Sequence, residues 1–483
     1  MRYLRNWISW CGVVLAASAL FAFLLLLAID QFAGLRNPYA GILGFVVAPG
    51  FFVVGITIAL IGAFLQRRRE HREAKAAKPR VITIDLSRRR DRRILIVFAV
   101  GSVAFLLLTA VGSYESYQYM ETEDFCGQRC HVPMQPEFVT AQHTAHANVE
   151  CVECHIGPGP AAYVKAKLNG TKQLVMTVAN NFQRPIYVTE ASPRPAQLIC
   201  ERCHWPQRYV GNVDRTYQHY LSDEKNTPFG VRLLMNVGGG DPSNGPPGGI
   251  HFHMNIANKI DYIATDERLT TIPWVRKTDP KGVVTEYRTA DFKDDLSAHY
   301  IRRMDCMDCH SRPAHKVKTP NDAVDLALST GRLDPKIPWV KSKVVAALAK
   351  PYNTSAEAEQ GITASLKEAY PDPAQANPII NEAKSIYRAN FFPEMKTDWQ
   401  THPDFIGHKN WNGCFRCHDG NHKTADGKGS IAASDCRSCH LILAQGSPEQ
   451  MTQINAQGYN FFHIDSEYSD FSCTDCHTGG PQK

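Results

Sequence analysis

Cys126-Gly-Gln-Arg-Cys130-His131 and Cys151-Val-Glu-Cys154-His155 are the first two of seven cysteine pairs in the chain, and a histidine directly follows each pair. The other five are Cys200-Glu-Arg-Cys203-His204, Cys306-Met-Asp-Cys309-His310, Cys414-Phe-Arg-Cys417-His418, Cys436-Arg-Ser-Cys439-His440 and Cys473-Thr-Asp-Cys476-His477. Six pairs enclose two residues, and the first encloses three. Only Cys11 among the 15 cysteines stands outside these motifs, and we expect it to be a small apolar packing residue.

The spacing of the motifs has a chemical reason. Two thiols three positions apart can each add to a vinyl group of one porphyrin, and the adjacent histidine can then bind the iron. A single Cys-x-x-Cys pair would also suit zinc, thiol redox chemistry or a disulfide. None of these needs a histidine directly after the second cysteine in every copy. The motifs therefore predict seven covalently attached c-type haems, with seven histidines as proximal iron ligands.

The remaining histidines are numerous enough to provide a second iron ligand at most sites. Of 19 histidines, seven lie in the motifs and His71 lies in a basic loop, which leaves eleven others. We expect the second ligands among those closest to the motifs: His143 or His146, His299, His315, His408, His422 and His463. His219, His251, His253 and His402 make up the rest of the eleven.

The first motif differs from the others. Met134 follows His131 by three positions and is a candidate axial ligand, which would raise the reduction potential relative to a second histidine. The alternative is that Met134 packs against the porphyrin, since methionine readily fills gaps. The extra residue between Cys126 and Cys130 leaves open whether both thioether bonds form.

Three apolar runs precede the motifs, at residues 7–29, 39–65 and 94–111. Each is about as long as a helix that crosses the roughly 30 Å of a bilayer core. The loop 66–93 holds twelve basic and four acidic residues, which places it in the cytoplasm by the positive-inside rule. All seven motifs then face the periplasm of a bacterial inner membrane. A cleaved signal peptide is the alternative for the first run, and the basic excess of this one loop does not indicate nucleic-acid binding.

These patterns predict a mainly α protein, with three N-terminal transmembrane helices followed by a periplasmic multihaem domain of sparse secondary structure. We expect a membrane anchor at 1–112, a first haem module at 113–215 with three motifs and a C-terminal module at 216–483 with four. The C-terminal module contains two stretches without motifs, 221–296 and 323–389. The alternating residues from His251 onward suggest a strand in the first stretch, and the second suggests short helices.

The segment from Phe125 to Ile156, with two motifs and a histidine-bearing stretch between them, resembles the NapC/NirT family of membrane-anchored quinol dehydrogenases. This resemblance covers residues 94–210, but members of that family use one membrane helix and four haems. Over most of its length the chain is more similar to the seven-haem inner-membrane cytochromes of the ImcH group. The stretches CERCHWPQRYVG (200–211), CMDCHSRPAH (306–315) and GHKNWNGCFRCHDG (407–420) carry that likeness.

The resemblance implies oxidation of menaquinol or ubiquinol at the membrane face. In the family, a lysine shortly after the second motif helps to hold the quinone; Lys167 is the best positional match, and Lys165 lies in the same stretch. The family's nearby aspartate has no counterpart, because the polar residues available are Asn169 and Gln173. The alternative role for these lysines is contact with lipid phosphate at the interface.

We therefore expect an inner-membrane quinol dehydrogenase that passes electrons through seven haems to periplasmic cytochromes or reductases. One alternative is a terminal reductase for a small substrate, which would need a haem with an open iron position beside acid-base residues. Another is a passive electron conduit whose helices serve only as an anchor. The same chain of haems could also run in reverse and reduce quinone.

Overall fold

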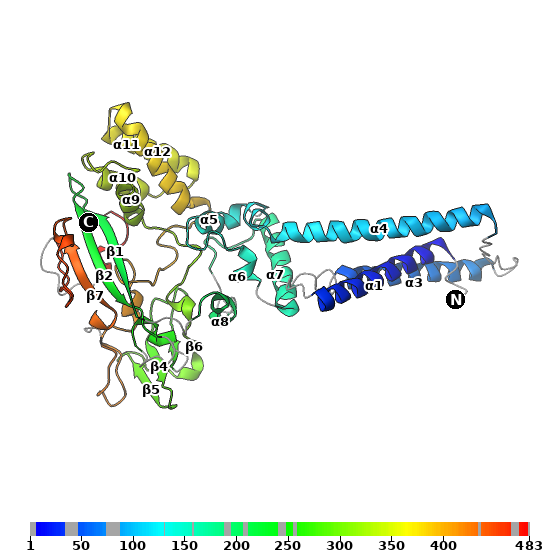
Figure 1. Ribbon diagram of the computed structural model, residues 1–483, viewed down its shortest axis with the longest axis horizontal. Coiled ribbons are helices and arrows are strands. Elements are labelled where there is room, and N and C mark those ends of the chain that lie inside the picture. Colours follow the sequence, from blue (N-terminus) through cyan, green and yellow to red (C-terminus); the bar gives the residue numbers. More distant parts are fainter. Residues whose placement is uncertain are drawn as a thin grey trace. The chain divides into compact units, whose positions relative to one another are not determined.

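The computed structural model describes residues 6–33, 47–73, 87–129, 131–156, 159–187, 195–205, 211–239, 248–254, 258–432, 436–464 and 473–481 (Figure 1). The chain divides into two units, and each is described by itself. The first consists of Met1–Cys126 and Glu150–Val175, and the second of Gly127–Val149 and Met176–Lys483. The first motif therefore lies where the chain passes from one unit to the other.

Long helices dominate the first unit. They are α1 (Trp7–Ala33), α3 (Ala48–Glu73) and α4 (Arg89–Glu121), followed after the first motif by the short α6 (Cys151–His155) and by α7 (Pro160–Val178), whose last residues belong to the second unit. The described parts of all three predicted apolar runs are helical. Residues 39–46 of the second run and 74–86 of the basic loop lie outside the described residues.

Small residues let α1 and α3 approach closely. A Cβ added at Gly12 would lie 2.3 Å from the amide nitrogen of Ala59, and one added at Gly55 would lie 2.5 Å from that of Ala16. Ser9 Oγ donates to the carbonyl oxygen of Ala59 at 3.0 Å, so a polar side chain also joins the two helices. Close contact through small residues with an interhelical hydrogen bond is typical of helices packed within a membrane.

Length and hydropathy distinguish these helices. Within the described ranges, Trp7–Leu25 is the one stretch that is both long and apolar enough to cross a bilayer, and Gly50–Gln66 in α3 is apolar but shorter. The prediction of three helices is thus confirmed, and the criterion for a spanning helix is met by the first of them. Their role as three membrane spans remains a prediction.

Two antiparallel sheets lie in the second unit. The first has the order β1-β2-β7, from β1 (Asn212–Tyr220), β2 (Pro228–Asn236) and β7 (His440–Gly446). The second has the order β5-β4-β3-β6, from β5 (Val284–Arg288), β4 (Trp274–Thr278), β3 (Lys259–Ile263) and β6 (Arg302–Arg303). Because β7 begins at the histidine of the sixth motif, the first sheet joins that motif to β2, where Met235 pairs with His440.

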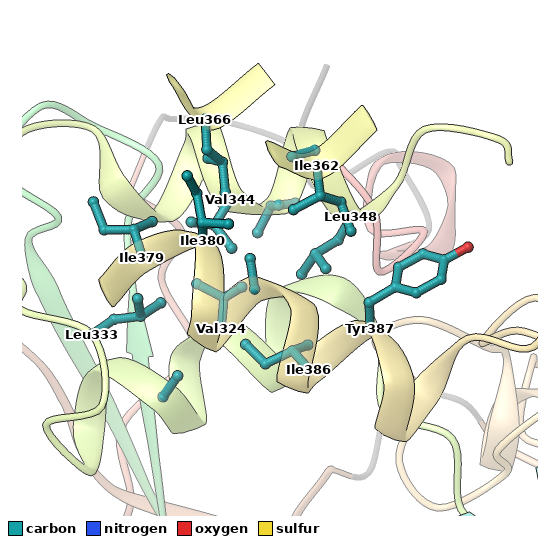
Figure 2. Close-up of a cluster of buried hydrophobic side chains, with 14 of the residues drawn as sticks. Val324, Leu333, Val344, Leu348, Ile362, Leu366, Ile379, Ile380, Ile386 and Tyr387 are labelled. Carbon is teal, nitrogen blue, oxygen red and sulfur yellow. The ribbon is translucent and has the colours of Figure 1, made fainter. Parts of the chain in front are cut away.

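The main hydrophobic core of the second unit is a cluster of four helices without motifs (Figure 2). The helices are α9 (Pro320–Ser329), α10 (Val340–Leu348), α11 (Ser355–Ala369) and α12 (Pro373–Asn390). Val324, Val344, Ile362 and Leu366 are fully buried among them. Thr319, Thr354 and Asp372 cap the starts of α9, α11 and α12, each accepting a hydrogen bond from a backbone amide of the first turn.

The structure confirms the short helices predicted for 323–389 and corrects two other expectations. The second unit holds two sheets, so the fold is mainly helical with a substantial β component rather than sparse in secondary structure. The strand predicted from His251 onward is wrong, because Ile250–Met254 forms a 3₁₀ helix, η7. The haem-free stretch 221–296 instead contributes β2, β3, β4 and β5.

Candidate functional site

A single helical turn carries each motif that the structure describes in full. The turns are α6, η4 (Cys200–Arg202), η9 (Cys306–Asp308), η11 (Gly413–Arg416) and α13 (Cys473–Cys476). In four of them the histidine amide donates to the carbonyl oxygen of the first cysteine, at 2.7 Å for His204, 2.8 Å for His310, 3.0 Å for His418 and 2.8 Å for His477. One closed turn brings cysteines three positions apart to the same side of the helix, as two bonds to one porphyrin require.

The first motif forms a wider turn. Cys126 lies in a π-helical segment, Phe125–Arg129, while Cys130 lies outside the described residues. A π turn holds about one residue more than an α turn, so it accommodates the additional residue of this motif. Gly127 is required by the packing, because a Cβ there would lie 2.1 Å from the ring of Phe138 in α5 (His131–Ala141).

Cysteines of different motifs lie close together. In the first unit the Cys151 thiol is hydrogen-bonded to Cys126, which raises the pKa of Cys151, and burial raises it further. In the second unit the hydrogen bond from Cys306 lowers the pKa of Cys200 to about 7. The attachment points of the first and second motifs, and those of the third and fourth, are therefore neighbours.

Four motif histidines of the second unit each face another histidine. The ring centroids are 6.0 Å apart for His146 and His204, 6.4 Å for His408 and His440, 5.8 Å for His463 and His477, and 5.9 Å for His253 and His418. Two iron–nitrogen bonds of roughly 2 Å each, with half a ring on either side, separate two imidazole centroids by about 6 Å. The facing rings thus fit a haem iron between them.

Burial disfavours the charged form of six histidines, four of which belong to these facing pairs. Burial lowers the pKa of His251, His253, His310, His408, His440 and His477. Neutral imidazole is the form that binds metals. The donor set therefore fits the covalently attached haem that the cysteine pairs require.

Other histidines favoured from the sequence have different surroundings. His422 is 1% exposed and uses both ring nitrogens, Nδ1 at 2.8 Å from Asp419 Oδ1 and Nε2 at 2.7 Å from the carbonyl oxygen of Ile272. His299 Nε2 lies 3.1 Å from Asp294 Oδ2, and His315 Nδ1 lies 3.0 Å from the carbonyl oxygen of Glu137. His422 has no ring nitrogen left for iron, so we do not carry it forward as a ligand.

Two further candidates lie near the first motif. His143 is exposed in the turn after α5. Met134 lies within α5 and is partly buried. Their roles at the first two haems stay predictions.

Lys167 forms an ion pair that the sequence did not predict. Its Nζ lies 3.0 Å from Oε1 of Glu121, the last residue of α4, and 4.9 Å from the ring centroid of Tyr163. Tyr163 and Lys167 share one face of α7 because they are four positions apart. Lys165 lies on another face and is exposed.

The carboxylate of Glu121 is buried. The residue is 6% exposed, and its Oε2 atom has no hydrogen-bond partner within the described residues. A buried acceptor of this kind favours a ligand that donates a hydrogen bond. The signal in the sequence was an acidic residue ten positions after the third apolar run, but 46 positions separate it from Lys167.

The comparisons with known proteins agree with these features. Residues 88–197 match the N-terminal region of the NapC/NirT cytochrome c family. The chain is 35% identical to the cytochrome c-type protein ImcH of Geobacter sulfurreducens, over 98% of this chain and 95% of that protein. No solved structure matches. The chain belongs to the NapC/NirT-related c-type cytochromes and shares nearly its full length with ImcH, as a membrane-anchored electron-transfer protein.

Proposed function

We propose that this cytochrome is an inner-membrane quinol dehydrogenase with seven c-type haems. It oxidises menaquinol or ubiquinol beside the first two motifs and delivers the electrons to periplasmic cytochromes or reductases. The haems, when bound, accept the electrons one at a time. The observation that carries the proposal is the pairing of Lys167 with the buried carboxylate of Glu121, in the unit that also holds Cys126 and Cys151.

Oxidation of a quinol releases two protons with its two electrons, so the site needs a base. Glu121 Oε2 is buried without a partner in the described residues, and it can accept a hydrogen bond and then a proton from a quinol hydroxyl. Lys167 holds the carboxylate in place through Oε1. Glu121 thus supplies the carboxylate that the NapC/NirT pattern places on an aspartate.

The exposed residues of α7, together with the close packing of α1 and α3 described above, support the placement of the first unit at a membrane. Val164, Leu168 and Val175 are exposed apolar residues on α7, and Lys167 lies on the same helix. An amphipathic helix of this type suits the boundary between headgroups and acyl chains. With three spans and the basic loop in the cytoplasm, the motifs lie in the periplasm.

We further propose that His146, His408 and His463 are the distal ligands of the third, sixth and seventh haems. Each faces the histidine of its motif at a separation that fits one iron. Their proximal partners are His204, His440 and His477.

The test of the proposed activity is reduction by a quinol. Purified protein in detergent, oxidised and mixed with a menaquinol analogue, should develop the absorbance of reduced c-type haem without any other protein. A ubiquinol analogue is tested in the same way. A hydroxyl compound that is not a quinol serves as the negative control and should leave the haems oxidised. If the haems stay oxidised with both quinols but are reduced by dithionite, the chain is a conduit that depends on a partner.

The haem number is tested by mass. We expect the intact protein to exceed the polypeptide mass of 53.9 kDa by seven haems. Replacing Cys473 and Cys476 with serine should remove one haem, because both attachment points of the last motif are lost. A mass increment of six or fewer haems in the unsubstituted protein would contradict the count.

A further inference from the structure

Arg416 is a buried cation inside the fifth motif, where it stands directly before Cys417. The residue is 8% exposed. Arg202 occupies the same position of the third motif, directly before Cys203, and it is exposed. Charged side chains are rarely buried unless they are paired, because removing a charge from water costs free energy. The contacts of the Arg416 guanidinium must therefore offset that cost.

The partners of this guanidinium are neutral groups. Nε donates to the carbonyl oxygen of Gly413 at 2.9 Å, Nη1 to that of Leu269 at 2.8 Å and Nη2 to that of Asp308 at 2.7 Å. The guanidinium carbon also lies 3.5 Å from the ring centroid of Phe405, a cation–π contact. Within the part of the chain that the structure describes, Arg416 forms no ion pair. Its donors are satisfied, but no carboxylate among these residues compensates its charge.

The side chain of Asp308 pairs with other groups, although its backbone carbonyl contacts Arg416. Its Oδ1 accepts a hydrogen bond from the Tyr262 hydroxyl at 2.5 Å and lies 3.5 Å from Nη2 of Arg302. Its Oδ2 accepts a hydrogen bond from the backbone amide of Asp305 at 2.6 Å. A different arginine therefore pairs with the acidic residue of the fourth motif.

Arg416 contacts the backbone of both the fourth and the fifth motif. Asp308 lies inside the fourth motif, and Gly413 directly precedes the fifth. Leu269 supplies the third carbonyl from a left-handed backbone conformation, with φ at 56°, which is unfavourable for a leucine. The guanidinium is thus held in one place, next to the attachment points of two haems.

A fixed positive charge beside a haem favours the reduced state of that haem. A ferric haem that accepts one electron from a reduced neighbouring haem becomes ferrous, and its net charge falls by one. A nearby cation stabilises the ferrous form by Coulomb attraction, and the effect is larger in a buried region because the effective dielectric constant is lower. The electrostatic surroundings and burial of a haem are among the factors that set its reduction potential. Arginine suits this role because its guanidinium keeps its proton in proteins.

We propose that Arg416 raises the reduction potentials of the two haems attached at the fourth and fifth motifs. One buried side chain acts on both haems through its charge and binds neither iron. The proposal requires haem at these two motifs and does not depend on quinol oxidation. An electron that enters the chain of haems is then retained more readily at these two sites than it would be without Arg416.

The test is a redox titration of the holoprotein, followed by haem absorbance. In Arg416→Gln, about two-sevenths of the absorbance should titrate at a lower potential than in the unsubstituted protein, because the charge beside two of the seven predicted haems is lost. Arg416→Lys keeps the charge but not the planar guanidinium, and it should titrate close to the unsubstituted protein. Arg202→Gln, the exposed counterpart in the third motif, should leave the titration unchanged because water and salt screen an exposed charge.

Two further measurements distinguish an effect of charge from an effect on folding. Intact mass should show the same covalent haem in every variant as in the unsubstituted protein. Arg416→Met is a second uncharged replacement, and it should lower the potential of the same fraction of the absorbance.

The proposal is overturned if both uncharged variants keep their haem and titrate like the unsubstituted protein, or if Arg416→Lys shifts as far as Arg416→Gln. A shift confined to about one-seventh of the absorbance would overturn the action on two haems, given one haem for each motif. Loss of haem from both uncharged variants would assign Arg416 a structural role instead. Failure of haem reduction by quinol in the unsubstituted protein is a separate result, because the titration uses chemical reductants.

Discussion

Glu121→Gln should lower the rate of haem reduction by quinol by about 100-fold or more, in line with the loss of a positioned general base. Glutamine preserves the size of the side chain but cannot take up the proton that a quinol hydroxyl must release. The measurement is stopped-flow absorbance of oxidised protein mixed with a menaquinol analogue. The amount of haem that dithionite reduces should stay the same, because Glu121 ligates no iron.

Matched variants distinguish a role of Glu121 and Lys167 in quinol oxidation from a general effect of charged residues on α4 and α7. Lys167→Met should also slow the reduction, since it removes the cation that holds the buried carboxylate in place through Oε1. Lys165→Met, two positions away and exposed, should react within twofold of the unsubstituted rate, and so should Glu115→Gln on the exposed side of α4. A normal rate for Glu121→Gln would exclude Glu121 as the proton acceptor, even if quinol oxidation itself is confirmed.

Lys341→Met should lower the free energy of unfolding of the second unit by about 3–5 kcal/mol, the usual cost of leaving one partner of a buried ion pair alone. Lys341 Nζ lies 2.7 Å from Asp325 Oδ1, and the two side chains are 4% and 5% exposed. The same carboxylate receives the amide of Tyr220 at 3.2 Å and lies 3.1 Å from Nδ1 of His219. The pair therefore joins α9, α10 and β1.

Denaturant unfolding of the holoprotein, followed by far-ultraviolet circular dichroism, measures this cost. Lys343→Met lies on the same helix but is exposed, and it should change the stability by less than about 0.5 kcal/mol. Adding Asp325→Asn to Lys341→Met should recover part of the loss, because the uncompensated charge is then removed. An unfolding midpoint unchanged by Lys341→Met would show that the pair contributes nothing net.

The sequence predicts well those features of the fold that depend on residues close to one another along the chain. The cysteine pairs, the helices at the apolar runs and the helices of 323–389 each depend on residues a few positions apart. The turn at His251 was misjudged because an apolar residue between two histidines suits a strand of period two and a 3₁₀ turn equally. The His251 amide donates to the carbonyl oxygen of Val237, 14 positions earlier, and the local pattern of residues does not indicate that contact.

The pairings of the site depend on contacts between distant residues. Glu121 and Lys167 are 46 positions apart, and nothing near either one identifies the other. His422 looked like a ligand because it follows the fifth motif closely, yet Asp419 and Ile272 take both its nitrogens. His253 is far from any motif along the chain, yet its ring centroid lies 5.9 Å from that of His418.

The cluster of α9–α12 has a consequence for how the apoprotein folds. A cytochrome whose cofactors are attached covalently exists first as bare polypeptide. Val324, Val344 and Ile362 come from consecutive helices, so their contacts are short in sequence and can form quickly. The cluster of α9–α12 can therefore fold before any haem is attached. The apoprotein then has one folded region before the haems are attached to the rest of the chain.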